Sequence, residues 1–166
     1  MKELFKSGKI PGITYNSKEV EEGFLFICKG VHFKEDYLAE AVRRGAIAYV
    51  SEKEYAAGAG IEAVIVDDIR EAMREAAEEF YGPVYEKLHM TGITGTKGKS
   101  STTYFMVGIL DDYMAGTGGK RSAVLSTINN YDGITDEESH LTTPEIMQFY
   151  KHMNNAVNCG IEYMTM

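Results

Sequence analysis

Short apolar runs alternate with amphipathic stretches in the first half of the chain. The runs predict strands at 12–15, 24–27, 46–50 and 63–66. Between and after them, residues 36–44 and 67–81 place their apolar side chains on one helical face. Glycines follow both stretches, as expected where helices end. This alternation predicts a small α/β domain.

Apolar runs and amphipathic stretches also alternate in the second half of the chain, which begins with a strand and a glycine-rich turn. Its pattern predicts strands at 88–94, 122–127 and 161–166, and helices at 98–114 and from 142–145 to Gly160. Thr143 is the expected N-cap of the last helix, ahead of Pro144 and Glu145. The polar stretch 129–140, NNYDGITDEESH, is expected to be a loop. Strands and helices in this order predict a parallel sheet with right-handed crossovers.

A domain boundary is expected between Gly82 and Lys87, where a helix stop leads into a short linker. The predicted domains are therefore residues 1–83 and 84–166. The predicted fold class is α/β: a small N-terminal α/β domain, followed by the beginning of a P-loop parallel-sheet ATPase domain. Ligands of such sheets bind at the carboxyl ends of the strands, where 94–99 and 126–127 lie.

The stretch Met90–Ser101, MTGITGTKGKSS, runs from a strand through a glycine-rich turn into a helix. It differs from the strict GxxxxGK[ST] pattern because the first glycine, Gly92, comes one residue early. A helix N-terminus with open amides and a lysine favours phosphate. Lys99 is therefore expected at the β/γ-phosphates of a nucleotide and Ser100 at its Mg²⁺.

Composition narrows the function classes. The chain has 166 residues, 17 basic and 25 acidic, for a net charge of −8. A nucleic-acid surface is not expected, because it needs a basic stripe. No apolar run approaches a membrane span or a secretory signal. The two cysteines predict no disulfide framework, and the histidines His32, His89, His140 and His152 show no metal spacing. A cytoplasmic protein fits these features.

Three separated segments make the chain resemble the Mur ligase family. Thr94–Ser100 reads TGTKGKS, where the family has Thr-Gly-Thr-Asn-Gly-Lys-[Ser/Thr]. Thr142–Glu145 is the family's Thr-Thr-Pro-Glu. Asn16–Phe26 is similar to its Asp-Ser-Arg-x-Val…Gly-x-x-Phe segment. The resemblance spans nearly the whole chain and is greatest to the class that adds the third amino acid of the peptidoglycan stem peptide.

The resemblance implies an ATP-dependent, Mg²⁺-dependent amino-acid ligase of peptidoglycan precursor synthesis. Such enzymes activate the carboxylate of a UDP-N-acetylmuramoyl-peptide as an acyl phosphate, which the amine of an amino acid attacks. It implies Lys99 as the catalytic phosphate ligand and Ser100 as the Mg²⁺ ligand. The rest of the nucleotide cradle would be Gly95, Thr96, Lys97, Gly98 and Ser101.

The same resemblance assigns the muramoyl substrate to Thr142 and Thr143, and its uridine end to Ser17. Each has a simpler interpretation: the threonines cap a helix, and the serine is a turn residue. The segment around Ser17 departs from the family, since Asn16 and Lys18 replace its aspartate and arginine. In the ATP loop, Lys97 replaces an asparagine.

The chain ends at Met166, where the family continues with Glu-Val-Ser. The sequence is therefore expected to be an N-terminal fragment of a longer ligase that binds nucleotide and does not ligate. Two alternatives stay open. One is another P-loop ligase or phosphotransferase, such as a relative of folylpolyglutamate synthetase. The other is a non-catalytic nucleotide-binding module.

Overall fold

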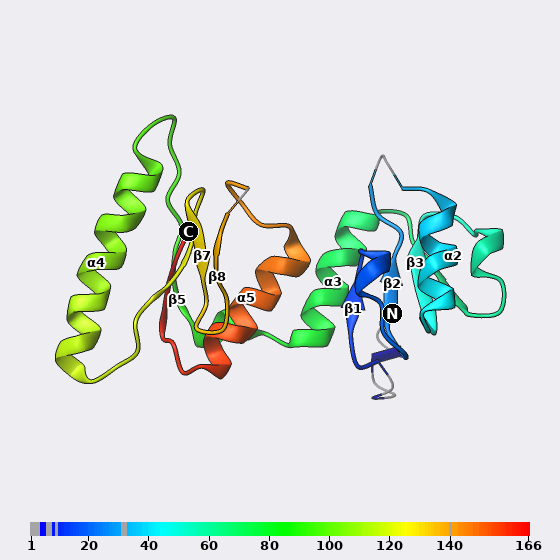
Figure 1. The fold of residues 1–166 in the computed structure, drawn as a ribbon, viewed down its shortest axis with the longest axis horizontal. Coiled ribbons are helices and arrows are strands. Elements are labelled where there is room, and N and C mark those ends of the chain that lie inside the picture. Colours follow the sequence, from blue (N-terminus) through cyan, green and yellow to red (C-terminus); the bar gives the residue numbers. More distant parts are fainter. Residues whose placement is uncertain (1–3, 6–7, 9, 31–32, 140) are drawn as a thin grey trace. The chain divides into compact units, whose positions relative to one another are not determined.

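A computed structural model describes residues 4–5, 8, 10–30, 33–139 and 141–166 of the chain. The chain divides into two compact units, Met1–Gly82 and Pro83–Met166, each with a sheet of its own (Figure 1). Both sheets contain parallel strands joined through helices, so the predicted α/β class is confirmed. No helix within the described ranges has the length and apolar character needed to cross a membrane. His32 and His140 lie outside the described residues.

The first unit is built on a four-stranded parallel sheet whose spatial order follows the sequence. Its strands are β1 (Ile13–Thr14), β2 (Leu25–Ile27), β3 (Ala48–Ser51) and β4 (Glu62–Ile65). Its helices are η1 (Ser17–Glu19), α2 (Glu35–Arg43), η2 (Ala56–Gly58) and α3 (Ile69–Tyr81). All residues of β2 and β3 are buried, whereas β4 is a largely exposed edge strand.

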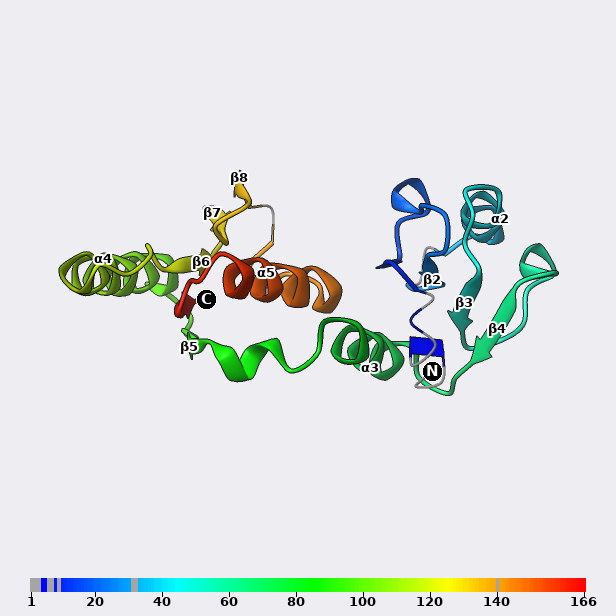
Figure 2. The same ribbon diagram turned by 90° about the horizontal axis from the view of Figure 1, so that it is seen from below.

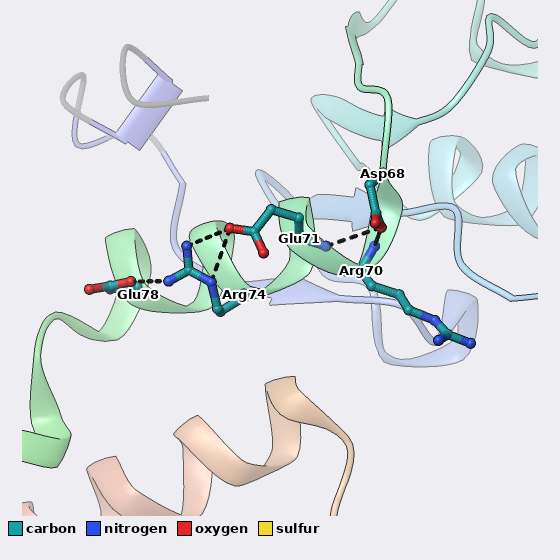
Figure 3. A network of polar contacts seen from close by, with 5 residues as sticks. All are labelled: Asp68, Arg70, Glu71, Arg74 and Glu78. Atoms are coloured by element: carbon teal, nitrogen blue, oxygen red, sulfur yellow. Dashed lines mark hydrogen bonds and ion pairs between the residues drawn. The ribbon is translucent and has the colours of Figure 1, made fainter.

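Helix α3 is fixed at its start and along its exposed face (Figure 3). The Asp68 carboxylate caps it by accepting bonds from the backbone amides of Arg70, at 2.7 Å, and Glu71, at 3.3 Å. Arg74 then bridges Glu71 and Glu78, each at 2.7 Å, from positions three and four residues apart. Exposed pairs of this kind contribute little to stability, because solvent screens the two charges. The buried face of α3, including Met73 and three alanines, provides most of its attachment.

The second unit has a five-stranded sheet in the order β5-β9-β6-β7-β8. Its strands are β5 (His89–Thr91), β6 (Ala123–Leu125), β7 (Asn129–Tyr131), β8 (Asp136–Glu138) and β9 (Tyr163–Thr165). Its helices are η3 (Val84–Lys87), α4 (Lys99–Thr117) and α5 (Ile146–Asn158). Strands β5, β9 and β6 are parallel, and α4 and α5 cover opposite faces of the sheet (Figure 2).

The polar stretch 129–140 is not the loop that its composition predicts. It contains β7 and β8, an antiparallel hairpin added to the edge of the parallel strands β5, β9 and β6, so the prediction of a loop there is wrong. The turn provides the reason. The Asp132 carboxylate accepts bonds from the amides of Ile134 and Thr135, and Gly133 has a φ of 92°. An Asp-Gly pair with these properties is a hairpin turn even between polar strands.

Helix α5 begins later than predicted. Its N-cap is Glu145, whose backbone is extended and whose side chain makes no capping bond, so Thr143 is not the cap. The first helical residue is Ile146, where the apolar face of the helix begins. Thr142 and Thr143 are left outside the helix as exposed residues. Their simpler interpretation as capping residues is therefore wrong.

Candidate phosphate-binding site

The loop between β5 and α4 has the backbone that its glycines predict. Gly95 has a φ of 155° and Gly98 a φ of 79°, values that residues with a side chain rarely adopt. Gly98 is the N-cap of α4, and no side chain caps the helix. The first backbone amides of a helix have no hydrogen-bond partner within that helix. The loop thus presents the positive end of a 19-residue helix.

Two lysines add positive charge at this helix end. Lys99 is half-buried, and its Nζ donates to the carbonyl oxygen of Gly95, 2.7 Å away across the loop. Thr96 and Lys97 are exposed on the loop itself. Although the chain carries a net charge of −8, this position combines two cations with a helix N-terminus. Such an arrangement attracts an anion.

A half-open cavity lies beside the helix start, at the carboxyl ends of the parallel strands. It is lined by Ile93, Lys99, Ser100, Thr103, Leu125, Ser126, Thr127, Thr142 and Met166. Met166, the residue after β9, completes this lining and exchanges backbone hydrogen bonds with Thr91 and Ile93 of the β5 segment. The structure therefore brings the predicted phosphate ligands Lys99 and Ser100 to the same cavity as Thr142.

The other predicted residues of this unit lie outside the cavity lining. Ser101 is exposed on the first turn of α4, and Thr143 is exposed next to Thr142. At the end of β6, the Thr127 hydroxyl lies 2.9 Å from the Ser100 hydroxyl. Tyr104 of α4 contacts Ser126 and bonds to Asn129, which ties the turn after β6 to the helix. No motif or spacing in the sequence marks Tyr104 or Asn129.

A buried polar cluster at the hairpin turn joins the hairpin to α5. The Asp132 carboxylate, which has no exposed surface, accepts bonds from His152 Nδ1 at 2.7 Å and Asn155 Nδ2 at 2.9 Å. Burial alone would raise the pKa of Asp132, but these bonds and the amides of Thr135 and Ile134 together lower it. In the sequence, this cluster is signalled by the Asp132-Gly133 pair and by the spacing of His152 and Asn155, three residues apart on one helical face.

Ser17 lies in the first unit and is buried in η1. Its hydroxyl donates to the Glu40 carboxylate of α2 at 2.6 Å, and this bond is the main reason that the pKa of Glu40 is lowered. Asn16 caps η1 by accepting from the amide of Lys18. The hydroxyl thus attaches η1 to α2, and substrate contact by Ser17 stays a prediction.

Comparisons with known proteins find Mur ligases, the family that the glycine-rich loop resembles. Residues 93–166 match the Mur ligase middle domain. The chain is 40% identical over 157 residues to the UDP-N-acetylmuramyl-tripeptide synthetase of Lactobacillus delbrueckii subsp. bulgaricus, a match covering 93% of this chain and 30% of that protein. It is 45% identical over 146 residues to the UDP-N-acetylmuramoyl-L-alanyl-D-glutamate–L-lysine ligase of Streptococcus pneumoniae, covering 87% of this chain and 29% of that one.

Solved structures show the same fold at lower identity. A UDP-N-acetylmuramoyl-L-alanyl-D-glutamate–2,6-diaminopimelate ligase matches with a TM-score of 0.67 and 22% identity, over 95% of this chain and 32% of the other. The MurF ligase of Thermotoga maritima in complex with ADP matches with a TM-score of 0.59 and 24% identity, over 100% and 33%. The chain thus spans about 30% of the length of the curated relatives described above. The resemblance inferred from the three sequence segments is confirmed.

Proposed function

We propose that this chain, which belongs to the Mur ligase family, binds the triphosphate of ATP together with Mg²⁺ at the N-terminus of α4. The observation that carries the proposal is the left-handed Gly98 that opens the helix directly before Lys99. The proposed cradle comprises Gly95, Thr96, Lys97, Gly98, Lys99, Ser100 and Ser101. Lys99 leaves the Gly95 carbonyl to hold the β/γ-phosphates, because a negatively charged phosphate attracts the ammonium group more strongly than a neutral carbonyl oxygen does.

The donor set fits Mg²⁺. This ion prefers hard oxygen ligands and usually takes only one or two of them from the protein, with nucleotide phosphates and water completing the shell. Ser100 offers a hydroxyl at the cavity. When bound, Mg²⁺ would neutralise charge that develops on the transferring phosphoryl group.

In a protein of the relatives' full length, we propose the chemistry of an acid–amino-acid ligase. An oxygen of the substrate carboxylate attacks the γ-phosphorus, the bond to the bridging oxygen breaks, and ADP leaves. The amine of the incoming amino acid then attacks the acyl carbon, and phosphate leaves as the peptide bond forms. Lys99 stabilises the negative charge of the phosphates during the first step. The proposed substrate is a UDP-N-acetylmuramoyl-dipeptide, as the relatives' names suggest.

Thr142 is the residue best placed to hold the muramoyl substrate near the γ-phosphate, because it lines the same cavity as Lys99. Thr143 extends this contact from the next position. Ser17 is proposed at the uridine end in the first unit. The relatives' names favour this activity over a folylpolyglutamate synthetase-like one.

Calorimetric titration of the 166-residue chain with ADP and Mg²⁺ tests the nucleotide site. A bond between a charged group and phosphate contributes roughly 1.5–3 kcal/mol, so Lys99→Ala should weaken binding by about tenfold or more. Lys120→Ala is the matched control, since Lys120 is an exposed lysine just beyond the other end of α4. An affinity of Lys99→Ala equal to that of the parent, or a parent that binds no ADP, would contradict the proposal.

A further inference from the structure

The turn that follows β6 is fixed both internally and from α4. The amides of Ile128 and Asn129 donate to Ser126 Oγ at 3.1 and 3.2 Å, and the Ser126 amide donates to the Asn129 carbonyl at 3.1 Å. Tyr104 reaches this turn from α4, one helical turn beyond Ser100. Ser126 is 7% exposed, so these bonds are shielded from water. The residue between them, Thr127, is therefore held in one place.

Thr127 presents its hydroxyl to the cavity. Its Oγ1 lies 2.9 Å from Ser100 Oγ, although the two residues are 27 positions apart in the sequence. Both line the cavity beside Lys99. Thr127 is exposed and Ser100 half-buried, so packing does not require their contact. Two hydroxyls from different elements thus meet at the mouth of the phosphate loop.

The two hydroxyls form a hydrogen bond, and their separation also equals that of neighbouring ligands in a magnesium shell. Mg²⁺ binds six oxygens at 2.0–2.1 Å in octahedral geometry, which places neighbouring ligands about 2.9 Å apart. Within the described part of the chain, no three His, Cys, Asp or Glu side chains gather as a metal site. Hydroxyl oxygens are then the hard donors that this cavity offers alongside nucleotide phosphates.

The geometry points to Thr127 as a second hydroxyl ligand, adjacent to Ser100, of the divalent cation that accompanies the nucleotide. This assignment rests on the proposed function, since the cation enters with the phosphates. This assignment also explains why the turn after β6 is fixed by several hydrogen bonds. The turn sets the distance between the two oxygens before the cation arrives, so little ordering is left for binding.

The test measures ADP binding to the 166-residue chain by calorimetry, in Mg²⁺ and in EDTA. Thr127→Val removes the hydroxyl at nearly constant shape, and Thr127→Ser keeps it. Thr117→Val is the control, because Thr117 lies at the end of α4 far from Ser100. The measured quantity is the ADP affinity in Mg²⁺ divided by the ADP affinity in EDTA. Loss of the ligand should reduce this ratio by roughly tenfold or more in Thr127→Val. The ratio should stay at the parent value in Thr127→Ser and Thr117→Val. Affinity in EDTA should be equal in all four proteins.

A change of metal preference distinguishes a ligand from a structural hydroxyl. A thiolate prefers a soft ion, so Thr127→Cys should lose Mg²⁺-dependent binding and gain binding with Cd²⁺ relative to the parent in the same Cd²⁺. Equal ratios in parent and Thr127→Val would overturn the inference while the nucleotide site stands. An equal loss in Mg²⁺ and EDTA would also overturn it. A parent that binds no ADP would refute the proposed function, and this inference with it.

Discussion

At the scale of single residues, Lys99 and Gly98 determine what the loop can do. Gly98 has a left-handed backbone, and a side chain there would be strained even though the surrounding space is open. Lys99 follows it as the first helical residue, with its ammonium group on the Gly95 carbonyl. This pair was predictable from the sequence, because glycine is the residue that adopts a left-handed backbone without strain. The sequence could not predict that the lysine bonds to its own loop, since rotamers are decided by local contacts.

The two cysteines should differ in reactivity. Cys28 is 8% exposed, and burial raises its pKa to about 12, whereas Cys159 is half-buried. Because the thiolate is the nucleophile, iodoacetamide at pH 7.5 should label Cys159 well before Cys28. Peptide mass spectrometry of the native chain measures both rates, and labelling in denaturant is the control in which they should converge. Equal rates in the native protein would mean that Cys28 is not buried as described.

At the scale of elements, the hairpin and α5 act together through Asp132. The carboxylate caps its own turn, and it accepts bonds from His152 and Asn155 of the helix. Gly133 packs so closely on Cys159 that an added Cβ would lie 2.8 Å from the cysteine Cβ. The hairpin is therefore attached to α5 by polar bonds and by contact at the turn.

Replacing this carboxylate should lower stability in a pH-dependent way. The folded pKa of Asp132 is lowered, so its contribution is present above the unfolded value of about 3.9 and is lost as the pH falls below it. Asp132→Asn should cost about 2 kcal/mol in unfolding free energy at pH 7, because it weakens bonds to a buried charge. The cost should shrink as the pH falls below about 4.

Urea unfolding at pH 7 and under acid conditions measures both effects. Asp112→Asn, an exposed aspartate on α4, is the control and should change stability by less than about 0.5 kcal/mol. A cost for Asp132→Asn that stays the same at every pH would show that the charge of the carboxylate contributes nothing to folding.

Most elements could be predicted from periodicity, and the failures have physical causes. The strands and helices with apolar faces were found because burial sets their period. The hairpin was missed because Asn129–Tyr131 and Asp136–Glu138 are polar and their pairing depends on the Asp-Gly turn. On α4, Phe105 and Ile109 are 75% and 65% exposed, although their spacing suggests a buried face. The spacing of apolar residues predicts that a helix has an apolar face, but it does not predict which other element covers that face.

At the scale of the whole molecule, the candidate site residues are divided between the two units. Lys99, Ser100 and Thr142 line one cavity in the second unit, at the carboxyl ends of its parallel strands. That position follows from the general rule for such sheets and was predictable. Ser17, in the first unit, was proposed from the family resemblance alone. The contact between Ser100 and Thr127 was not predictable, since it depends on how the turn after β6 folds onto α4.

Amide chemical shifts test the central claim most directly. In proton–nitrogen NMR spectra of the 166-residue chain, titration with Mg²⁺ and a non-hydrolysable ATP analogue should move the amides of Gly95, Gly98, Lys99 and Ser100 most. The amide of Gly118, at the other end of α4, should stay in place. Unmoved loop amides at saturating nucleotide, or largest shifts elsewhere in the chain, would contradict phosphate binding at this helix end.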